Sequence, residues 1–320
     1  MSDLQTRQLI VDTAAKIFGD HVDKPMLDAA EAGVFPSKLW SLVTENGFHQ
    51  LGSAGSGTDA QDLFSFLQVC GRHAVPLPIA DTLLANRWCG PSAGLASVGR
   101  VGANGHVVDA TWGRMAERVL AVEKGRDDIQ ICSDATVVRQ RTNMGGEPAD
   151  EMKLGEVQTH RVDPSPYAQL ALARVNLMAG SLQAQLDLGI LFASERLQFG
   201  RSISKFQAIQ HSLAVVAAEV AAAMRAADAA IDALDGDRFV PEVAAAKSRV
   251  GEAAGTVSEQ VHQIHGAMGF TYEHRLHHFS RRTWAWRDSW GNEFEWQEVL
   301  GRHLAGVGAD KVWDFIATRG

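Results

Sequence analysis

The hydrophobic positions of residues 1 to about 95 recur at the intervals that an α-helix places on one face. In LQTRQLIVDTAAKIFGD (4–20) and FPSKLWSLVTENGF (35–48), apolar residues return every three or four positions, which predicts amphipathic helices. Pro36 suits a helix start, because its fixed backbone angle matches the first turn. The glycine-rich stretch 52–60 lacks the Gly-Lys-Ser/Thr of a phosphate-binding loop, so we expect a solvated connection there. We predict an N-terminal helical domain over 1–95.

The pattern changes to short β-branched runs between residues 96 and 162. The runs HVVDATW, RVLAVEK, DIQICSD, ATVVRQRT and GEVQTHRV alternate with Gly, Asn and Asp. Such alternation is typical of strands joined by turns. The stretch is too short for a large sandwich, so we expect a small middle β domain, either a compact barrel or a sheet, over 96–162.

Helical periodicity returns at about residue 163 and dominates to residue 320. Apolar stripes run along four segments, which are 166–196, one from about 204, one beginning near Pro241, and 292–317. Alanines beside larger aliphatic residues suit close antiparallel packing of long helices. We therefore predict a mainly α protein with a small β domain and a C-terminal four-helix bundle over 163–320. The same stripes would also suit a coiled coil with a partner.

Composition and charge narrow the class of protein. The net charge is −8 and the pI is near 5.8, without a strongly basic tract, which argues against nucleic-acid binding. No apolar run reaches the roughly 20 residues of a membrane helix, and the N-terminus lacks a signal-peptide pattern. The three cysteines have no CxxC spacing, which indicates reduced thiols. We expect a cytoplasmic protein that does not bind membranes.

Two turns between the predicted bundle helices contain more polar, charged and aromatic side chains than a simple helix connection needs. The first reads ERLQFGRSISKF (195–206) and holds a cation, an amide and two aromatic rings, at Arg196, Gln198, Phe199 and Phe206. The second reads QIHGAMGF (263–270) and holds two polar side chains and two glycines, at Gln263, His265, Gly266 and Gly269. Glycine lets a backbone approach a ligand closely, because it has no Cβ. An arginine offers a fixed fork to a phosphate group.

These turns resemble the "R-x-x-F-G-x-x-I-x-x-F-Q" and "Q-x-x-G-G-x-G-(F/Y)" turns of the acyl-CoA dehydrogenases, in the same order and about 65 residues apart. The order of the three domains is also that of the family. The resemblance covers roughly residues 165–303 and is loose before them. It implies that FAD is the cofactor and that Arg196 binds the FAD pyrophosphate of a neighbouring subunit. It also implies that Phe199 and Phe206 lie against the adenine and that Gln198, Gln263 and His265 add polar contacts.

The residues that perform the family's reaction are missing from their expected places. That reaction resembles removal of an α proton by a carboxylate, with hydride transfer from the β carbon to flavin N5. The family places the carboxylate in a "Y-E-G-T" segment or on the first bundle helix, and the matching positions here are Gly291 and about Leu170. The middle-domain segments "T-E-P-x-A-G-S-D" and "G-x-K-x-W-I-T-N", which cover the flavin ring, are also absent, and Trp112 is no substitute by motif.

This loss of one half of the site favours a division of labour between two chains. We hypothesise that the chain is the non-catalytic, FAD-binding subunit of a heteromeric acyl-CoA dehydrogenase. A second acyl-CoA dehydrogenase-like chain, in an α2β2 complex, would supply the rest of the site. The acyl-CoA substrate would be a thioester of a bulky acid, for which a steroid side chain is one candidate. The sequence identifies neither the acyl group nor the electron acceptor.

Two other hypotheses stay open. In the first, the chain is a complete homo-oligomeric dehydrogenase whose base has moved to Glu293 or Glu295, although a shift of two residues turns a side chain by roughly 200° on a helix. In the second, it is a flavin-free helical-bundle interaction protein. The paired turns argue against the second hypothesis.

The segment YEHRLHHFSRRTWAWRDSW (272–290) has three unusual features. Its histidines, His274, His277 and His278, have no fixed carboxylate or cysteine that completes a recognisable ligand set, so we expect no metal site. Its tryptophans, together with Trp296, favour interface anchors over core filler. Its arginines at 275, 281, 282 and 287 favour contact with an acidic partner surface or with phosphate groups.

Overall fold

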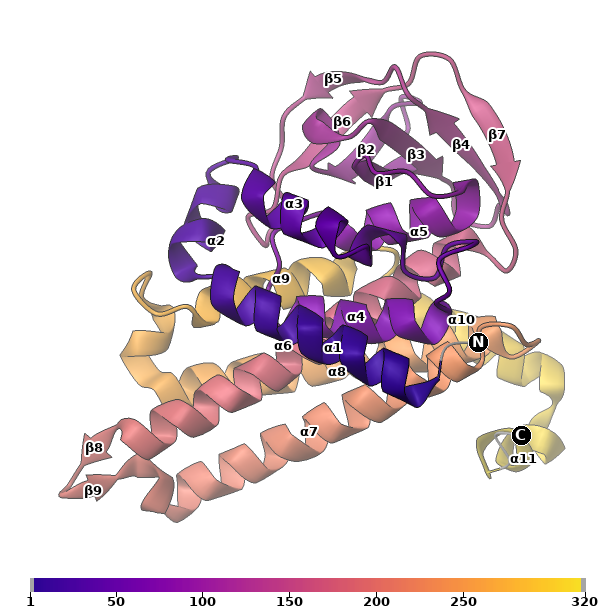
Figure 1. The fold of residues 1–320 in the computed structure, drawn as a ribbon. Coiled ribbons are helices and arrows are strands. Elements are labelled where there is room, and N and C mark those ends of the chain that lie inside the picture. The colour runs from indigo at the N-terminus through magenta and orange to yellow at the C-terminus, as the bar shows by residue number, and fades with distance from the viewer. Residues whose placement is uncertain (1–2, 318–320) are drawn as a thin grey trace.

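The N-terminal part of the chain is helical in the computed structural model, which describes residues 3–317. Its helices are α1 (Leu4–His21), α2 (Lys24–Glu31), α3 (Ser37–Glu45), α4 (Ala60–Arg72) and α5 (Ile79–Cys89). Three of them, α1, α2 and α4, follow an aspartate whose carboxylate accepts a hydrogen bond from a first-turn backbone amide. The expectation that this region is helical is confirmed (Figure 1).

A seven-stranded sheet follows, in the order β5-β6-β2-β1-β3-β4-β7. The strands are β1 (Ala96–Val101), β2 (Val107–Thr111), β3 (Arg118–Val122), β4 (Asp128–Cys132), β5 (Thr136–Arg139), β6 (Ala149–Lys153) and β7 (Gln158–Arg161). β1 and β3 are parallel, and the other neighbours are antiparallel. In Figure 1 the sheet lies above the helices.

Three long helices form the body of the C-terminal half. They are α6 (Pro166–Glu195), α7 (Gln207–Asp232) and α8 (Phe239–His265). α9 (Leu276–Asp288) packs on α6 and α8, and α10 (Glu293–Val307) packs on α8. The expected last helix is interrupted at Gly308, where φ is +92°, before α11 (Val312–Ala317). Two helices, α9 and α10, thus pack on the body of three long helices where a four-helix bundle would have one.

Two glycines allow the N-terminal helices to pack tightly on the bundle. A Cβ on Gly180 of α6 would lie 1.8 Å from the backbone oxygen of Gln68 in α4, and one on Gly71 would lie 2.0 Å from the oxygen of Leu177. No side chain fits at these distances. The crossing of α4 and α6 is thus fixed by glycine on both helices, and a hydrophobic core continues from the N-terminal helices into the bundle.

Three tryptophans and four arginines between residues 275 and 296 make contacts within the chain. Trp286, Trp290 and Trp296 are buried, so the expectation that they anchor an interface is wrong for these three. Arg282 is also buried and donates to the carbonyl of Ala74. The remaining arginines of this group also have partners in the chain. Arg281 pairs with Glu31, Arg287 pairs with Glu293, and the Arg275 guanidinium lies over the ring of Phe279. The expectation of a free basic surface for a partner is therefore wrong as well.

Candidate functional site

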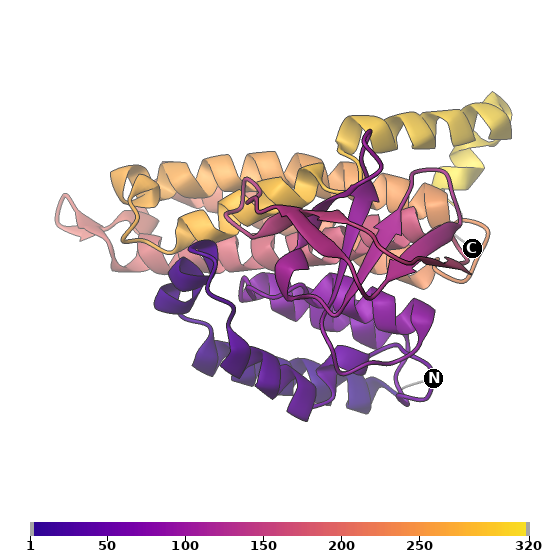
Figure 2. The ribbon, with the colours of Figure 1, turned by 90° about the horizontal axis from the view of Figure 1, so that it is seen from above.

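The two motif turns lie at the same end of the bundle. α6 runs toward this end and leads into a small hairpin, β8 (Leu197–Gln198) and β9 (Arg201–Ser202), which projects from the body of the protein (Figures 1 and 2). α8 runs in the same direction and leads into the 3-10 turn Gly266–Phe270. The ring of Phe192, near the end of α6, stacks on the ring of His265 with 4.4 Å between centroids. We call this end, residues 195–206 and 263–272, the bundle tip.

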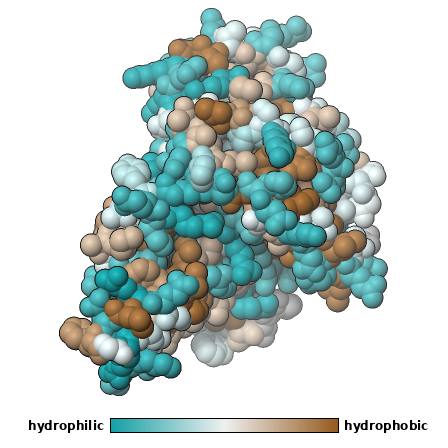
Figure 3. Space-filling view, turned by 60° about the vertical axis from the view of Figure 1, so that its left-hand side comes forward, coloured by the Kyte–Doolittle hydropathy of each residue, from teal (hydrophilic) through white to brown (hydrophobic). Residues whose placement is uncertain are grey.

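The hairpin of the bundle tip exposes a cation and aromatic surface. Arg196 caps the C-terminus of α6, and its exposed side chain makes no ion pair with any residue between 3 and 317. Phe199 has a φ of +54° and is 91% exposed. Its ring lies 6.1 Å from that of Phe206, which Arg201 covers at 4.3 Å. Gln198 pairs with Arg201 across the hairpin and is exposed too. Figure 3, in which this side comes forward, shows hydrophobic side chains at the surface among hydrophilic ones.

The second turn of the bundle tip is partly buried. Gln263 is exposed, whereas His265 is buried and donates from Nδ1 to the Val261 carbonyl at 2.7 Å. Burial lowers the pKa of His265 to about 4, so the ring is neutral at pH 7, and its Nε2 has no partner among the described residues. Gly266 has a φ of +57° and open space around it. At Gly269 a Cβ would lie 2.9 Å from Cβ of His265, so this glycine serves internal packing.

These residues suit one half of a dinucleotide. An exposed, unpaired guanidinium suits a diphosphate, an exposed aromatic ring suits an adenine face, and an unpartnered imidazole nitrogen can accept a hydrogen bond. In FAD, the dinucleotide that the resemblance implies, the flavin ring supplies the chemistry of hydride acceptance. No residue of the bundle tip lines the cavity described next.

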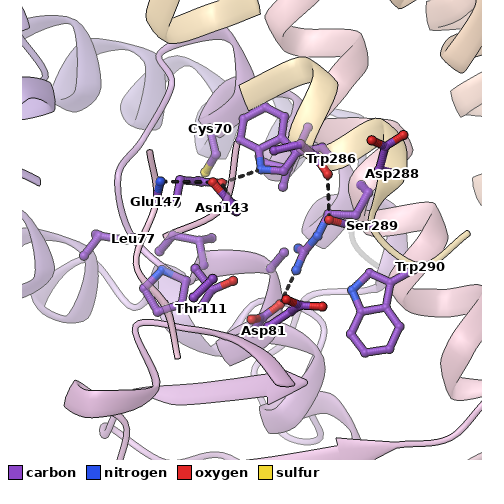
Figure 4. A pocket seen from close by; sticks show the side chains of 18 of the residues that line it. Cys70, Leu77, Asp81, Thr111, Asn143, Glu147, Trp286, Asp288, Ser289 and Trp290 are labelled. Atoms are coloured by element: carbon purple, nitrogen blue, oxygen red, sulfur yellow. Dashed lines mark hydrogen bonds and ion pairs between the residues drawn. The ribbon is translucent and has the colours of Figure 1, made fainter. Parts of the chain in front are cut away.

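A separate cavity of about 240 Å³ lies between the sheet, α5, α6 and α9 (Figure 4). Asp81 of α5 and Arg174 of α6 form an ion pair in its wall, with 2.7 Å between Nη2 and Oδ1. Their side chains are 1% and 8% exposed. Burial raises the pKa of Asp81, and the charge of Arg174 opposes that rise. A buried ion pair therefore forms part of the cavity wall, beside apolar side chains such as Leu77, Ile79 and Leu177.

A second polar group lines the same cavity. Glu147 is buried and accepts hydrogen bonds from Asn143 Nδ2 at 2.9 Å and from Trp286 Nε1 at 3.2 Å. Figure 4 shows these three residues together on the wall away from Asp81 and Trp290. Sequence reasoning missed Asp81, Arg174 and Glu147, because each is a single polar residue without a local motif.

The two places expected for a catalytic base hold none. Leu170 is fully buried in the core, and the residues of α6 that line the cavity are Arg174 and Leu177. Gly291 has a φ of +90°, and a Cβ there would lie 2.6 Å from Trp296 Nε1. The residue of this segment that lines the cavity is Trp290, one position earlier. A glutamate at 291 would therefore require the backbone to rearrange, and the cavity wall carries an indole.

The alternative bases are engaged in ion pairs. Glu293 accepts from Arg287 Nε at 2.9 Å, and Glu295 accepts from Lys124 Nζ at 2.5 Å. The hydrogen bond from Lys124 lowers the pKa of Glu295. Neither glutamate lines the cavity. Trp112 does not line the cavity either. Its side chain is buried, and its Nε1 donates to the Pro76 carbonyl at 3.1 Å.

Known proteins are similar to this chain in sequence and in fold. The family described as acyl-CoA dehydrogenase, C-terminal domain, matches residues 166–289. The acyl-CoA dehydrogenase IpdE2 of Mycobacterium tuberculosis is 26% identical over 88% of this chain and 92% of its own length. The ChsE4-ChsE5 complex of M. tuberculosis has a similar fold, with a TM-score of 0.83 and 17% identity over 96% of this chain and 99% of the matched chain. The Tcur3481-Tcur3483 steroid ACAD variant gives a TM-score of 0.81, with 18% identity over 95% and 99% of the two chains.

Residues 166–289 match the C-terminal domain of the acyl-CoA dehydrogenases, and the chain as a whole has the acyl-CoA dehydrogenase fold. The resemblance drawn from the two turns is confirmed, since both lie inside the matched range. Among the described residues, none of the helices is both long and apolar enough to cross a bilayer.

Proposed function

We propose that this chain is the FAD-binding subunit of a heteromeric acyl-CoA dehydrogenase. It supplies the diphosphate and adenosine half-site, and a partner chain of the same family supplies the flavin-ring pocket and the catalytic carboxylate. The observation that carries the proposal is the contrast between the bundle tip, which presents Arg196 and Phe199 to solvent, and the cavity, which holds a buried ion pair.

The bundle tip supports the first half of the proposal. Phe199 is 91% exposed, in the same hairpin as the unpaired Arg196. Exposed apolar groups favour association, so this surface is expected to be covered by a ligand or a partner. Leu197, Phe270 and Tyr272 add exposed apolar area at the same end, at 67%, 77% and 76%. The guanidinium and the rings would meet the pyrophosphate and adenine of a cofactor that the partner holds by its other end.

The cavity supports the second half. A general base must reach the substrate proton, within hydrogen-bond distance in the complex. Three of the four carboxylates that line the cavity are engaged, Asp81 with Arg174, Glu147 with Asn143 and Trp286, and Asp109 with Arg100 at 2.5 Å. The fourth, Asp288, is exposed. An indole, Trp290, lies where the family's glutamate segment meets the cavity.

The known relatives support the heteromer. Two of the structures with this fold are named for two different chains, ChsE4-ChsE5 and Tcur3481-Tcur3483, and the latter is described as a steroid ACAD. We accordingly propose an α2β2 assembly and a CoA thioester of a bulky acid, such as a steroid side chain, as the substrate class. The reaction would be α,β-dehydrogenation of that thioester.

The test is the ratio of FAD to this polypeptide in the native complex, isolated with whatever chain co-purifies. We expect one FAD per two chains and a second dehydrogenase-like polypeptide, and no acyl-CoA dehydrogenation by this chain alone. One FAD per copy of this chain, with turnover and no partner, would overturn the proposal in favour of a complete enzyme. A stable complex that retains no flavin would favour the flavin-free interaction protein.

A further inference from the structure

Three side chains from the two ends of the chain meet between α2 and α9. Asp28 of α2 and His277 and His278 of α9 each place one donor atom within 4.8 Å of the others, and they are the one such group of three among residues 3–317. Asp28 Oδ1 lies 3.1 Å from His278 Nε2. The sequence predicts no metal site, because no fixed carboxylate or cysteine completes a recognisable ligand set with these histidines. The fold supplies that carboxylate from a distant segment.

Both imidazole rings are held by their other nitrogen. His278 Nδ1 lies 2.7 Å from Glu31 Oε1, and His277 Nδ1 lies 2.8 Å from the His274 carbonyl oxygen. A carboxylate and a carbonyl only accept hydrogen bonds, so each Nδ1 carries the proton. In the neutral rings, each Nε2 therefore presents a lone pair. Both Nε2 atoms are buried and neither makes a hydrogen bond of good geometry with a described residue, although that of His278 lies within ion-pair distance of Asp28 Oδ1, the third donor of the group.

Unpartnered buried nitrogens of this kind call for an explanation, because buried polar atoms are normally satisfied. A histidine whose Nδ1–H is fixed by a carboxylate or a carbonyl, with Nε2 left free, has the arrangement of a metal ligand. His278 has no exposed side-chain surface, so water does not satisfy its nitrogen from bulk solvent. Two imidazole nitrogens and one carboxylate oxygen form a donor set that suits Zn²⁺.

We propose that Asp28, His277 and His278 bind one divalent transition metal ion, with Zn²⁺ favoured by the donor set. Glu31 and the His274 carbonyl orient the two rings, and water completes the coordination on the side of Asp28. Tetrahedral ligands about 2.0–2.1 Å from zinc lie roughly 3.4 Å apart. The Asp28 side chain is 46% exposed and can rotate to reach that spacing.

The ion pairs around the three donors leave the proposed ligand atoms free to bind the ion. Lys24 Nζ contacts Asp28 Oδ2 at 2.6 Å, which is the oxygen turned away from His278. Arg281 contacts Glu31 Oε2 at 3.0 Å, so Glu31 keeps Oε1 for His278. The ion would join α2 of the N-terminal helices to α9 of the bundle. It is a structural site, and it goes beyond the proposed flavin function.

The experiment uses the full chain without a polyhistidine tag, stripped with EDTA and desalted. Zn²⁺ is titrated in competition with a chromophoric chelator, and thermal unfolding is followed with and without Zn²⁺. We expect one ion per chain and a rise in Tm on adding Zn²⁺. Asp28→Asn and His277→Gln are expected to lower the affinity at least tenfold. The matched control His211→Gln, which removes an exposed histidine of α7, is expected to change neither readout.

Two results would overturn the proposal. The first is Zn²⁺ uptake by Asp28→Asn and His277→Gln that equals that of the wild type, since the ion would then bind elsewhere. The second is no one-to-one uptake by the wild type. In that case the contacts of His278 with Asp28 and Glu31 would be structural contacts that hold no ion. Asp28 is partly exposed, so its variant is expected to fold, and circular dichroism checks this.

Discussion

Arg174 Nη2 lies 2.7 Å from Asp81 Oδ1 and joins the third turn of α6 to the first turn of α5 inside the cavity wall. Removing one partner of a buried ion pair leaves the other charge uncompensated. We expect Arg174→Met to lower the free energy of unfolding by about 3–5 kcal/mol, measured by urea denaturation of the isolated chain. The exposed pair of Arg72 and Asp187 gives the control, since Arg72→Met is expected to lose about 0–1 kcal/mol. A loss equal to the control would show that the pair contributes little.

Arg196 should determine how tightly the complex retains FAD. A charge-assisted hydrogen bond to a charged group contributes about 1.5–3 kcal/mol, so Arg196→Ala should weaken FAD binding by roughly 10- to 100-fold. Flavin fluorescence released on dilution of the purified complex measures this. Arg201→Ala is the matched control in the same hairpin, because Arg201 already lies over Phe206. Equal retention by the Arg196 variant and the wild type would remove the main support for a diphosphate site.

The double variant Glu293→Gln, Glu295→Gln should leave turnover of the complex within about twofold of the wild type. Both carboxylates are occupied by cations outside the cavity, whereas loss of a general base lowers rates by about 10²- to 10⁴-fold. Steady-state acyl-CoA oxidation with an artificial electron acceptor measures the effect. A loss of a hundredfold or more would assign the base to this chain and favour the complete enzyme.

Stability should fall as the pH is lowered from 6.5 toward 4, in part because of His265. Burial lowers its folded pKa from 6.5 to about 4, so between these values the unfolded chain binds a proton that the folded chain excludes. The contribution of the neutral ring to the free energy of unfolding is fully present above pH 6.5 and is lost as the pH falls from 6.5 to 4. The slope is at most about 1.4 kcal/mol per pH unit and is reduced by solvent screening.

His265→Asn keeps a donor for the Val261 carbonyl and removes the titration. Its free energy of unfolding should therefore depend less steeply on pH between 4 and 6.5, while His211→Asn should follow the wild type. Urea unfolding at several pH values provides the comparison. His262 and His274 face the same ring and also have pKa values lowered by burial, so part of the slope should remain in the variant. An unchanged slope would contradict the prediction.

The α4–α6 crossing should not tolerate a methyl group. Gly180→Ala would place Cβ 1.8 Å from the Gln68 carbonyl, so the helices must separate, at a cost of at least about 2 kcal/mol. Gly255→Ala in α8 is the matched control, because no atom lies within 4 Å of its added Cβ. That change should stabilise the chain by about 0.5–1 kcal/mol through better helix propensity. Denaturation midpoints of the two variants should therefore move in opposite directions.

Local patterns in the sequence predict the three long helices of the bundle, but neither α9 nor the whole sheet. The strand runs that were recognised are rich in valine and isoleucine, whereas β6 reads ADEMK, which consists largely of good helix formers. It is a strand because it pairs with β2 on one side and β5 on the other. β1 includes Gly99, whose Cβ would lie 2.4 Å from Val107 Cγ1. Both elements are strands because they pair with neighbouring strands, and their own composition does not reveal that pairing.

The bundle tip could be anticipated from sequence because each of its turns is a continuous motif. The cavity could not, since Asp81, Asn143, Arg174 and Trp286 come from four distant segments. The same holds for Asp28 beside His278. Polar residues that meet only in three dimensions leave no periodic signal, and each of them looks like an ordinary surface residue along the chain.

The contact between Glu31 and Arg281 spans 250 residues, which sets an order of events during synthesis. A ribosome adds about 5–20 residues per second, so α2 waits roughly 10–50 s before α9 exists for it to dock against. During that interval the nascent N-terminal helices lack one of their packing surfaces. A chain that stops short of α9 would leave Glu31 of α2 without His278 and Arg281. Such truncated chains should be cleaved by proteases faster than the full chain.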